Sequence, residues 1–297
     1  MLQLTSNNIC CIIITYNPDD RLLGLINTLN SQVDKIIIVD NNSNRFGLVL
    51  QADESNELLL IRNKENFGIA KALNQGVSEA IKMKYDWVIT FDQDSTPYNN
   101  IIEIISNVYE LYPDKSKIGA IGVNALNSKS ERYYNVSGSQ QYCERDYLIT
   151  SGCLISVSAF IEIGGFREDF FIDNVDLEYS LRLRKHGKIS LITNACGMMH
   201  EAGAVIIKKR FGISISTTNH NITRRYYMAR NHVILSKEYF LKFPYFILKT
   251  NYFFFLSLIK LIISDDNKKL KIKSSLKGIK DGILYNSKDN SILLNKN

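Results

Sequence analysis

The sequence predicts an α/β protein with a mostly parallel central sheet and a helical C-terminal appendage. Short apolar runs alternate with helical patterns through the first half of the 297 residues. The runs are apolar along their whole length, which is typical of parallel strands covered by helices on both faces. The last quarter is instead rich in aromatic residues and then in lysine. We therefore expect two parts, 1–231 and 232–297.

The expected elements of the first half repeat the order strand, helix, strand. Strands are expected at 9–15, 35–40, 58–63 and 87–92, and helices at 18–32 and 69–82. The crossovers that join parallel strands should be right-handed. In an open sheet of this kind, ligands bind beyond the carboxyl ends of the strands.

The second half is less regular. We expect helices at about 100–111, 158–163 and 170–187, and strands at 118–126 and 147–157. The helix 170–187 ends at Gly187 after basic residues, which favour a helix C-terminus. Asp173 lies near its start, where it is either an N-cap or a functional carboxylate.

Composition indicates a folded protein. Hydrophobic residues make up 45% and charged residues 22%, which excludes collagen-like, mucin-like and strongly disordered chains. The cysteines are odd in number and form no CxxC pair, as expected of reduced, buried thiols in a cytosol: Cys10, Cys11, Cys143, Cys153 and Cys196. No basic region followed by a long apolar stretch opens the chain, so we expect no signal peptide and a cytoplasmic protein.

The C-terminal part is apolar and then basic. The segment from Asp265 to Asn297 contains eight lysines and four aspartates, so it contributes +4 of the net charge of +6. The stretch 244–264 has the length of a membrane span, but Lys249, Asn251 and Lys260 favour an interfacial helix. We expect peripheral contact with the inner face of the plasma membrane and no nucleic acid partner. The alternative is a core or dimer helix with a solvated tail.

Two aspartates one residue apart follow the buried run 87–91. If the backbone stays extended through Asp92 and Asp94, both carboxylates point to the same side and repel. A divalent cation shared with phosphate oxygens would remove that repulsion. The alternative is a solvated loop that turns at Pro97.

Two further polar clusters end expected strands, Thr15-Tyr16-Asn17 and Asp40-Asn41-Asn42-Ser43. Three clusters at one sheet edge form a floor for a nucleotide, although loops are polar in any case. Asn66 and Gly68 precede the helix 69–82, where a glycine allows close backbone approach and the helix N-terminus favours an anion. The absence of GxxxxGK[ST] and GxGxxG argues against kinase, GTPase and dehydrogenase functions.

An ordered set of motifs runs along residues 9–231: ITYNP (14–18), IVDNNS (38–43), NFGIAKALNQG (66–76), FDQDS (91–95), SGCLIS (151–156), GGFRE (164–168), FIDNVDLEYSLRLRKHG (171–187) and MMHEAG (198–203). This set resembles family 2 glycosyltransferases of the GT-A fold, a Rossmann-like fold of nucleotide-diphospho-sugar transferases. FDQDS, FIDNVDLE and RRYYMARN (224–231) are most similar to bacterial rhamnosyltransferases that use dTDP-L-rhamnose.

The resemblance implies roles for single residues. It places the nucleotide beside Thr15, Tyr16, Asn17, Asp40, Asn42, Asn66, Gly68, Asp92 and Gln93. It gives the metal to Asp94 and His200, although His200 taken alone would be a satisfied buried histidine. Arg224, Arg225 and Arg230 would approach the diphosphate over a mobile loop, 203–223, unless they are ordinary surface or interface arginines.

The expected chemistry has two requirements. Charge builds on the leaving diphosphate, and Mg²⁺ or Mn²⁺ would stabilise it. The acceptor hydroxyl must lose a proton to a general base on the opposite side of the sugar, so the anomeric centre inverts. We expect Asp173 to be this base, with Asp176 as the second candidate. Many relatives carry Glu-Asp where this chain has Asp173-Asn174, which puts the role of the second acid in doubt.

We therefore expect a metal-dependent inverting glycosyltransferase that transfers L-rhamnose from dTDP-L-rhamnose to a lipid-linked saccharide in bacterial surface polysaccharide synthesis. A UDP-sugar donor (N-acetylglucosamine, galactose or glucose) with the same machinery is the first alternative. A nucleotidyltransferase and a non-catalytic scaffold are further alternatives. Intact Asp92, Asp94 and His200 argue against a scaffold, which has no use for two converging charges.

Overall fold

The computed structural model describes residues 4–44, 47, 49, 58–136, 139–200, 206–210 and 213–286. Two compact units are present. The first unit comprises Met1–Phe171 with Val175–Ala202, and the second comprises Ile172–Asn174 with Gly203–Asn297. Three residues thus group with the second unit although both their chain neighbours belong to the first. The domain boundary expected after residue 231 is not tested by this grouping and stays a prediction.

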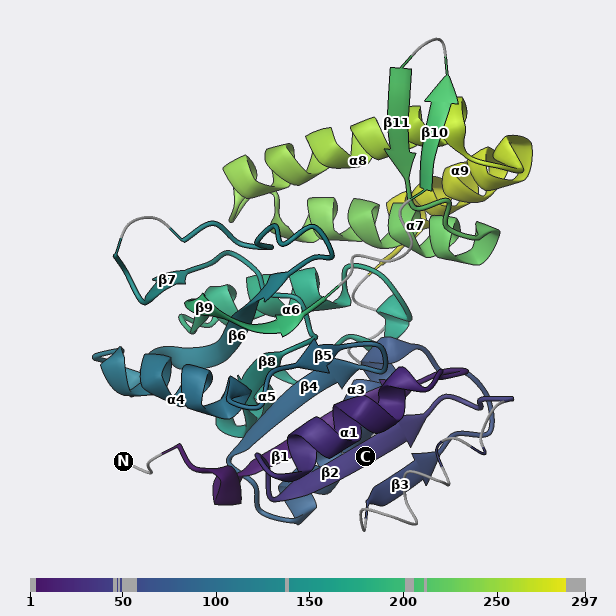
Figure 1. The fold of residues 1–297 in the computed structure, drawn as a ribbon. Coiled ribbons are helices and arrows are strands. Elements are labelled where there is room, and N and C mark those ends of the chain that lie inside the picture. The colour runs from purple at the N-terminus through teal and green to yellow at the C-terminus, as the bar shows by residue number, and fades with distance from the viewer. Residues whose placement is uncertain are drawn as a thin grey trace. The chain divides into compact units, whose positions relative to one another are not determined.

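One mixed sheet forms the centre of the first unit (Figure 1). Within the described residues its strands are β1 (Ile9–Thr15), β2 (Lys35–Asp40), β3 (Leu59–Arg62), β4 (Trp87–Asp92), β5 (Thr96–Pro97), β6 (Ile118–Leu126), β7 (Tyr142–Glu144), β8 (Cys153–Ser156) and β9 (Ile189–Met199). Their order is β3-β2-β1-β4-β8-β6-β9-β5, and β7 also pairs with β9. Strands β3, β2, β1 and β4 are parallel, as are β6 and β9, whereas β8 is antiparallel to both its neighbours. The predicted α/β class is confirmed.

Helices cover both faces of this sheet, as the uniformly apolar strands predict. They are α1 (Arg21–Asn30), α3 (Ile69–Lys82), α4 (Ile101–Leu111), α5 (Val157–Ile163) and α6 (Val175–Lys185). Helices α1 and α4 share a core with Cys11 and Ile13 of β1. Helix α3 lies on the other face, where a Cβ added to Gly76 would come within 2.5 Å of the Ile12 side chain. Figure 1 shows α1 in front of the sheet and α3 behind it.

The strand order reverses between β1 and β4. The chain runs outward from β1 to β2 and β3, then crosses back to place β4 on the other side of β1. In open α/β sheets, ligands bind at the carboxyl ends of the strands where the order reverses. Thr15 ends β1 and Asp92 ends β4, and Ile14 of β1 pairs with Asp92. Thr15 also pairs with Asp40, which ends β2, so the topology brings all three predicted polar clusters together.

Three expected elements differ from the structure. The helix expected at 170–187 is limited to α6, Val175–Lys185, because Phe171, Asp173 and Asn174 have positive φ, so Asp173 lies before the helix. The strand expected at 147–157 is limited to Cys153–Ser156, because the residues before it form a loop and turn. The loop expected at 203–223 contains an antiparallel hairpin, β10 (Ile206–Arg210) and β11 (Ile213–Thr217). Alternating side chains in short strands are easily mistaken for loop sequence when polar residues interrupt them.

The second unit is mainly helical, as predicted for the C-terminal appendage. It contains α7 (Ile222–Tyr239), α8 (Pro244–Ser264) and α9 (Lys268–Leu284) in addition to the hairpin (Figure 1). Asp265, which is buried, accepts hydrogen bonds from Arg225 Nη2 (2.8 Å), Thr217 Oγ1 (2.5 Å) and Lys271 Nζ (3.3 Å). Burial alone would raise the pKa of Asp265, but these partners hold it below its ordinary value. The network joins the hairpin to the helices, and Arg225 is committed to it.

Candidate functional site

A buried carboxylate braces the loops that follow β1 and β2. Because these strands pair in register, Thr15 lies beside Asp40. Asp40 Oδ1 accepts from Thr15 Oγ1 at 2.8 Å and from Ser43 Oγ at 2.5 Å, and Oδ2 accepts from the Ser43 N–H at 2.9 Å. Both Thr15 and Asp40 are fully buried. Both side chains therefore act as a brace for the two loops, and the nucleotide contacts predicted for Thr15 and Asp40 stay predictions.

Gln93 joins the loop after β1 to the loop after β4. Its side-chain amide accepts from the Tyr16 N–H at 2.7 Å and donates to the Tyr16 carbonyl at 3.2 Å. Asn17, at φ 51°, donates its N–H to Ser43 Oγ and accepts at Oδ1 from the Asn44 N–H. These bonds fix the backbone and leave the Tyr16 ring half exposed, where it can stack on a base. Gln93, predicted to bind nucleotide, is therefore engaged in positioning Tyr16.

Asn66 and Gly68 precede α3 as expected. The group that closely approaches Gly68 is the backbone of Phe171, from the same chain. Gly68 has φ 86°, and an added Cβ would lie 2.5 Å from the carbonyl oxygen of Phe171. The Ile69 N–H donates to the same carbonyl at 2.7 Å, and Asn66 Oδ1 accepts from the Gly68 N–H at 2.9 Å. The start of α3 is thus covered by Phe171. Asn42 is exposed and left-handed, at φ 64°.

The aspartate pair is arranged differently from the expectation. Strand β4 ends at Asp92, and the chain turns at once, with the Ser95 N–H donating to the Asp92 carbonyl at 3.1 Å. The backbone is therefore not extended through Asp92 and Asp94, and the predicted alignment of their two carboxylates is wrong. Asp94 sits on the turn, 41% exposed, with its Oδ2 atom 3.9 Å from Nη1 of Arg21.

His200 lies near this turn. Strand β5 pairs with β9 so that Thr96 opposes Met199, which brings the residue after β9 toward the residues before β5. The His200 ring meets the Tyr133 ring edge-on at 5.7 Å. Among the described side chains, no three of His, Cys, Asp and Glu gather as a metal cage. A Mg²⁺ ion typically takes one or two carboxylates together with substrate phosphates. The metal role predicted for Asp94 and His200 stays a prediction.

Asp173 belongs to a second cluster, within the second unit. Arg224 of α7 forms a fork on its carboxylate, with Nε 3.0 Å from Oδ2 and Nη2 2.9 Å from Oδ1. The buried Asn231 donates Nδ2 to the carbonyls of Ile172 (2.9 Å) and Asp173 (3.0 Å). Asp173 and Asn174 are left-handed, at φ 65° and 61°, a strained state for residues other than glycine. Helix α7 therefore holds a strained segment in place.

Sequence reasoning missed Asn231 and His220. Arg224 and Asn231 are seven residues apart, two helical turns, and this spacing on a helix was the available signal that they share a face. His220 is half-buried; burial lowers its pKa to about 4, assisted by the charge of Arg224, so the ring is neutral at neutral pH. No sequence pattern singled it out.

Asp176 and Arg230 have other surroundings. Asp176 belongs to the first unit, in the first turn of α6, and accepts from the Leu177 N–H at 2.8 Å. After burial, its charge is a further cause of the raised pKa of Tyr147. Arg230 donates Nη1 to Asn231 Oδ1 at 2.9 Å and lies over the Tyr285 ring. The roles predicted for both stay predictions.

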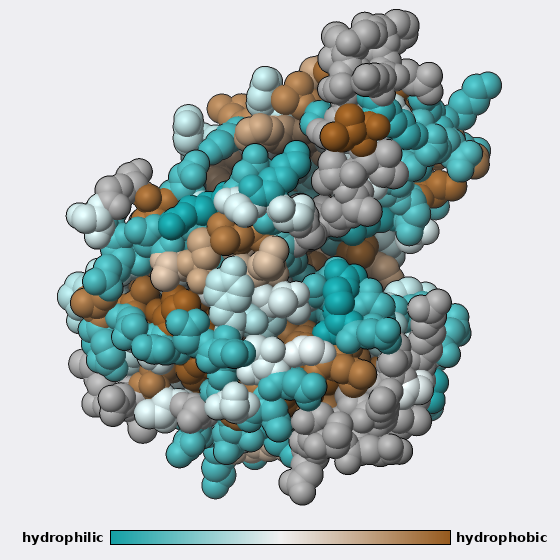
Figure 2. Space-filling model, in the orientation of Figure 1, coloured by the Kyte–Doolittle hydropathy of each residue, from teal (hydrophilic) through white to brown (hydrophobic). Residues whose placement is uncertain are grey.

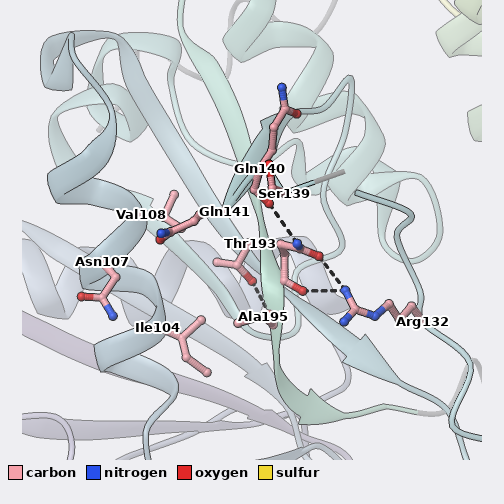
Figure 3. A pocket seen from close by; sticks show the side chains of 10 residues that line it. Ile104, Asn107, Val108, Arg132, Ser139, Gln140, Gln141, Thr193 and Ala195 are labelled. Atoms are coloured by element: carbon pink, nitrogen blue, oxygen red, sulfur yellow. Dashed lines mark hydrogen bonds between the residues drawn. The ribbon is translucent and has the colours of Figure 1, made fainter. Parts of the chain in front are cut away.

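A separate cavity of about 350 Å³ lies beside α4 and the β7–β9 edge. Arg132 Nη1 donates to Asn194 Oδ1 at 2.6 Å, and Asn194 Nδ2 donates to the Gln140 carbonyl at 2.9 Å. Figure 3 shows Arg132 and Gln140 among the residues that line the cavity. None of the residues predicted for the functional site lines it. Its walls are the Arg132 guanidinium, amides, hydroxyls and apolar side chains. This cavity is distinct from the edge formed by β1 and β4.

Comparison with known proteins gives concordant results. The family model described as glycosyl transferase family 2 matches residues 10–161. The dTDP-rhamnosyl transferase RfbF of Shigella flexneri is 31% identical over 248 residues, which cover 78% of this chain and 81% of that protein. The poly-beta-1,6-N-acetyl-D-glucosamine synthase of Staphylococcus aureus is 26% identical over 203 residues, covering 58% of this chain and 45% of the synthase.

Solved structures of similar fold include residues 1–349 of TarS from S. aureus, with a TM-score of 0.51 at 12% sequence identity. That match covers 98% of this chain and 75% of TarS 1–349. The TarS complex with UDP-GlcNAc gives a TM-score of 0.52, covering 97% and 76%. At this identity the likeness shows the fold alone.

Proposed function

Because the chain belongs to glycosyl transferase family 2 and has the GT-A fold, it is a glycosyltransferase, and we propose that it transfers L-rhamnose from dTDP-L-rhamnose with inversion. Support for the donor comes from the 31% identical relative, which is itself named a dTDP-rhamnosyl transferase. The fold alone does not fix the sugar.

The observation that carries the proposal is the edge where β1 meets β4. There the sheet order reverses, and the residues of that edge are already braced by Asp40 and Gln93. This arrangement leaves the Tyr16 ring exposed for a base and Asp94 half exposed for a cation. A nucleoside diphosphate needs both kinds of contact.

We further propose that Asp94 and His200 hold Mg²⁺ or Mn²⁺ against the diphosphate. Bound there, the cation would neutralise the charge that develops on the leaving phosphates. Arg21 Nη1 lies 3.9 Å from Asp94 Oδ2, and Arg21 is also paired with Asp19 at 2.7 Å. At its length and exposure, the Arg21–Asp94 pair is weak enough for a divalent cation to displace.

We assign the general base to Asp173. Arg224 fixes the plane of this carboxylate by donating twice to Oδ1 and once to Oδ2. Since each oxygen accepts about two bonds, Oδ2 keeps a position for the acceptor hydroxyl. Arg224 in this role orients the base, which supplements the diphosphate contact predicted for it. Asp176 remains the second candidate.

A UDP-sugar donor is the second candidate function. The TarS structures include complexes with UDP and UDP-GlcNAc, and a more distant relative is a poly-N-acetylglucosamine synthase. The same exposed tyrosine and half-exposed aspartate would serve any pyrimidine nucleoside diphosphate. The donors therefore differ in contacts to the base and the sugar.

For the acceptor, we propose a lipid-linked saccharide at the inner face of the plasma membrane, as part of bacterial surface polysaccharide synthesis. The support is indirect and comes from the exposed apolar and basic residues of α8 and α9. An enzyme with a lipid-anchored acceptor gains from working at the membrane surface, because both reactants are then confined to one plane.

Calorimetric binding of dTDP, UDP, GDP and CDP to the full chain, each with and without Mn²⁺, tests the function. The proposal requires metal-dependent binding of dTDP that Asp94→Asn abolishes. A preference for UDP would keep the transferase but reject rhamnose. If no nucleotide binds in a metal-dependent way, the metal site is wrong and the scaffold alternative gains.

A further inference from the structure

Helix α8 carries an exposed apolar stripe. The side chains at 245, 248, 252, 255, 259 and 262 are between 36% and 81% exposed, and they are Tyr245, Leu248, Tyr252, Phe255, Ile259 and Ile262. Their spacing alternates between three and four residues, which places them within an arc of roughly 100°. Figure 2 shows apolar surface on the unit that holds this helix.

The other side of α8 is occupied by its own unit. Phe246, Ile247 and Leu261 are buried, and Asn251 Oδ1 receives hydrogen bonds from His232 Nε2 (2.7 Å) and Ser236 Oγ (2.8 Å) of α7. These contacts fix the rotation of the helix about its axis. The stripe is therefore held outward.

Basic side chains accompany the stripe. Lys249 and Lys260 are exposed along one of its borders, from which their ammonium groups can reach out of an apolar layer. On α9 the exposed lysines are Lys269, Lys273, Lys277 and Lys280, within roughly 80° of one another by helical geometry. Leu276, Ile283 and Leu284 are exposed among them. The acidic residue of α9, Asp281, accepts from the Tyr226 hydroxyl at 2.7 Å.

We propose that α8 lies in the plane of an anionic membrane with its stripe among the acyl chains and that the α9 lysines bind acidic headgroups. Apolar area and basic charge together give the two signals that stable peripheral attachment needs. This inference rests on the proposed function, because the attachment would bring the enzyme to a lipid-linked acceptor.

The same observations argue against two other arrangements of α8, a membrane-spanning helix and a symmetric dimer. In the described part of the chain, α8 is the one helix that is long and apolar enough to cross a bilayer. A span would place Lys249 and Lys260 in or near the hydrocarbon and expose the polar contacts of Asn251 to lipid, which is costly. A symmetric dimer through the stripe would bring like-charged lysines together, since a two-fold interface pairs a surface with itself.

Co-sedimentation of the full chain with vesicles tests the inference, without donor or acceptor. One set contains phosphatidylcholine alone and the other includes phosphatidylglycerol. We expect binding to the anionic vesicles that a high-salt wash reverses. Tyr252→Ser with Phe255→Ser should weaken it at least tenfold, and Lys269→Gln with Lys273→Gln roughly thirtyfold, at about 1 kcal/mol per lysine.

Matched controls lie in the first unit. Ile161→Ser removes an apolar side chain that is 58% exposed on α5, and Lys129→Gln removes an exposed lysine, so neither should change vesicle binding. Thermal unfolding of each variant checks that it folds. Nucleotide binding, measured separately, shows whether the proposed function fails independently of the attachment.

Three results would overturn the proposal. The chain could fail to bind either vesicle, or it could resist extraction by salt as a spanning helix would. Alternatively, sedimentation equilibrium without lipid could show a dimer that the α8 variants dissociate, in which case a second copy covers the stripe.

Discussion

The nucleotide edge of the first unit and the Asp173 cluster of the second are built by different means. At the edge, polar groups at the ends of parallel strands bond to one another: the Thr15 hydroxyl and the Ser43 N–H donate to the Asp40 carboxylate, and Gln93 accepts from the Tyr16 N–H. In the Asp173 cluster, Arg224 reaches a carboxylate 51 positions earlier in the chain and forms an ion pair. The proposed nucleotide edge is set by the sheet, whereas the position of Asp173, the proposed base, depends on how one helix is anchored.

The first test of this comparison removes the proposed base, Asp173, and leaves the proposed nucleotide edge intact. Asp173→Asn preserves the shape of the side chain but cannot take a proton, so turnover of dTDP-L-rhamnose should fall roughly 10²- to 10⁴-fold. Nucleotide binding measured by calorimetry should stay unchanged, because the proposed nucleotide edge is built from residues of the first unit and Asp173 belongs to the second.

Two variants serve as controls for that result. Arg224→Lys keeps the charge and loses the fork, and should give an intermediate loss of turnover. Asp176→Asn should have a smaller effect than Asp173→Asn. The reverse ranking would transfer the role of base to Asp176.

The second test removes the anchor of α7. Asp265→Asn leaves Arg225 and Lys271 buried without their counter-charge, which should lower the free energy of unfolding by about 3–5 kcal/mol. Urea unfolding measures this change. The neighbouring Asp266→Asn is the matched control, because that side chain is 63% exposed and should matter little. Equal effects of the two would mean that the buried network does not hold the unit.

A third test concerns Gly68, which precedes α3 and lies against the backbone of Phe171. Gly68→Ala combines a left-handed backbone, at roughly 1–2 kcal/mol, with a clash against the Phe171 carbonyl. Gly164→Ala is the control for a positive φ alone, since Gly164 is in the αL region at φ 83° and ψ 30° and has open space around it, whereas Gly68 has ψ 169°. Thermal unfolding should show a larger loss for Gly68→Ala. Equal losses would show that the Phe171 contact yields at no cost.

The smallest expected effect is a pH dependence of stability from His220. Its pKa is about 4 in the folded protein against an ordinary 6.5, so between these values the unfolded chain binds more protons. Its contribution is complete above pH 6.5 and is lost as the pH falls toward 4. His220→Gln should flatten the slope of unfolding free energy in that window, whereas His186→Gln, at an exposed position, should not. An unchanged slope would place the His220 ring in water.

Much of the nucleotide edge could be predicted from the sequence. The runs ending at Thr15, Asp40 and Asp92 are strands with the predicted ends, and 69–82 is a helix over the same residues. Apolar periodicity and strand ends are local properties, and parallel strands necessarily bring their ends to one edge. The motif order added the family, which the comparisons confirm.

The tertiary structure alone decided the rest. The turn after Asp92, the cover that Phe171 places on α3, and the hold of Arg224 and Asn231 on Asp173 all depend on loops whose course no periodicity encodes. Even the outward rotation of the α8 stripe is set by Asn251 and its partners on α7. Local pattern determines which residues form strands and helices, whereas contacts between distant segments determine which side chains meet, because those contacts exist only after the chain has folded.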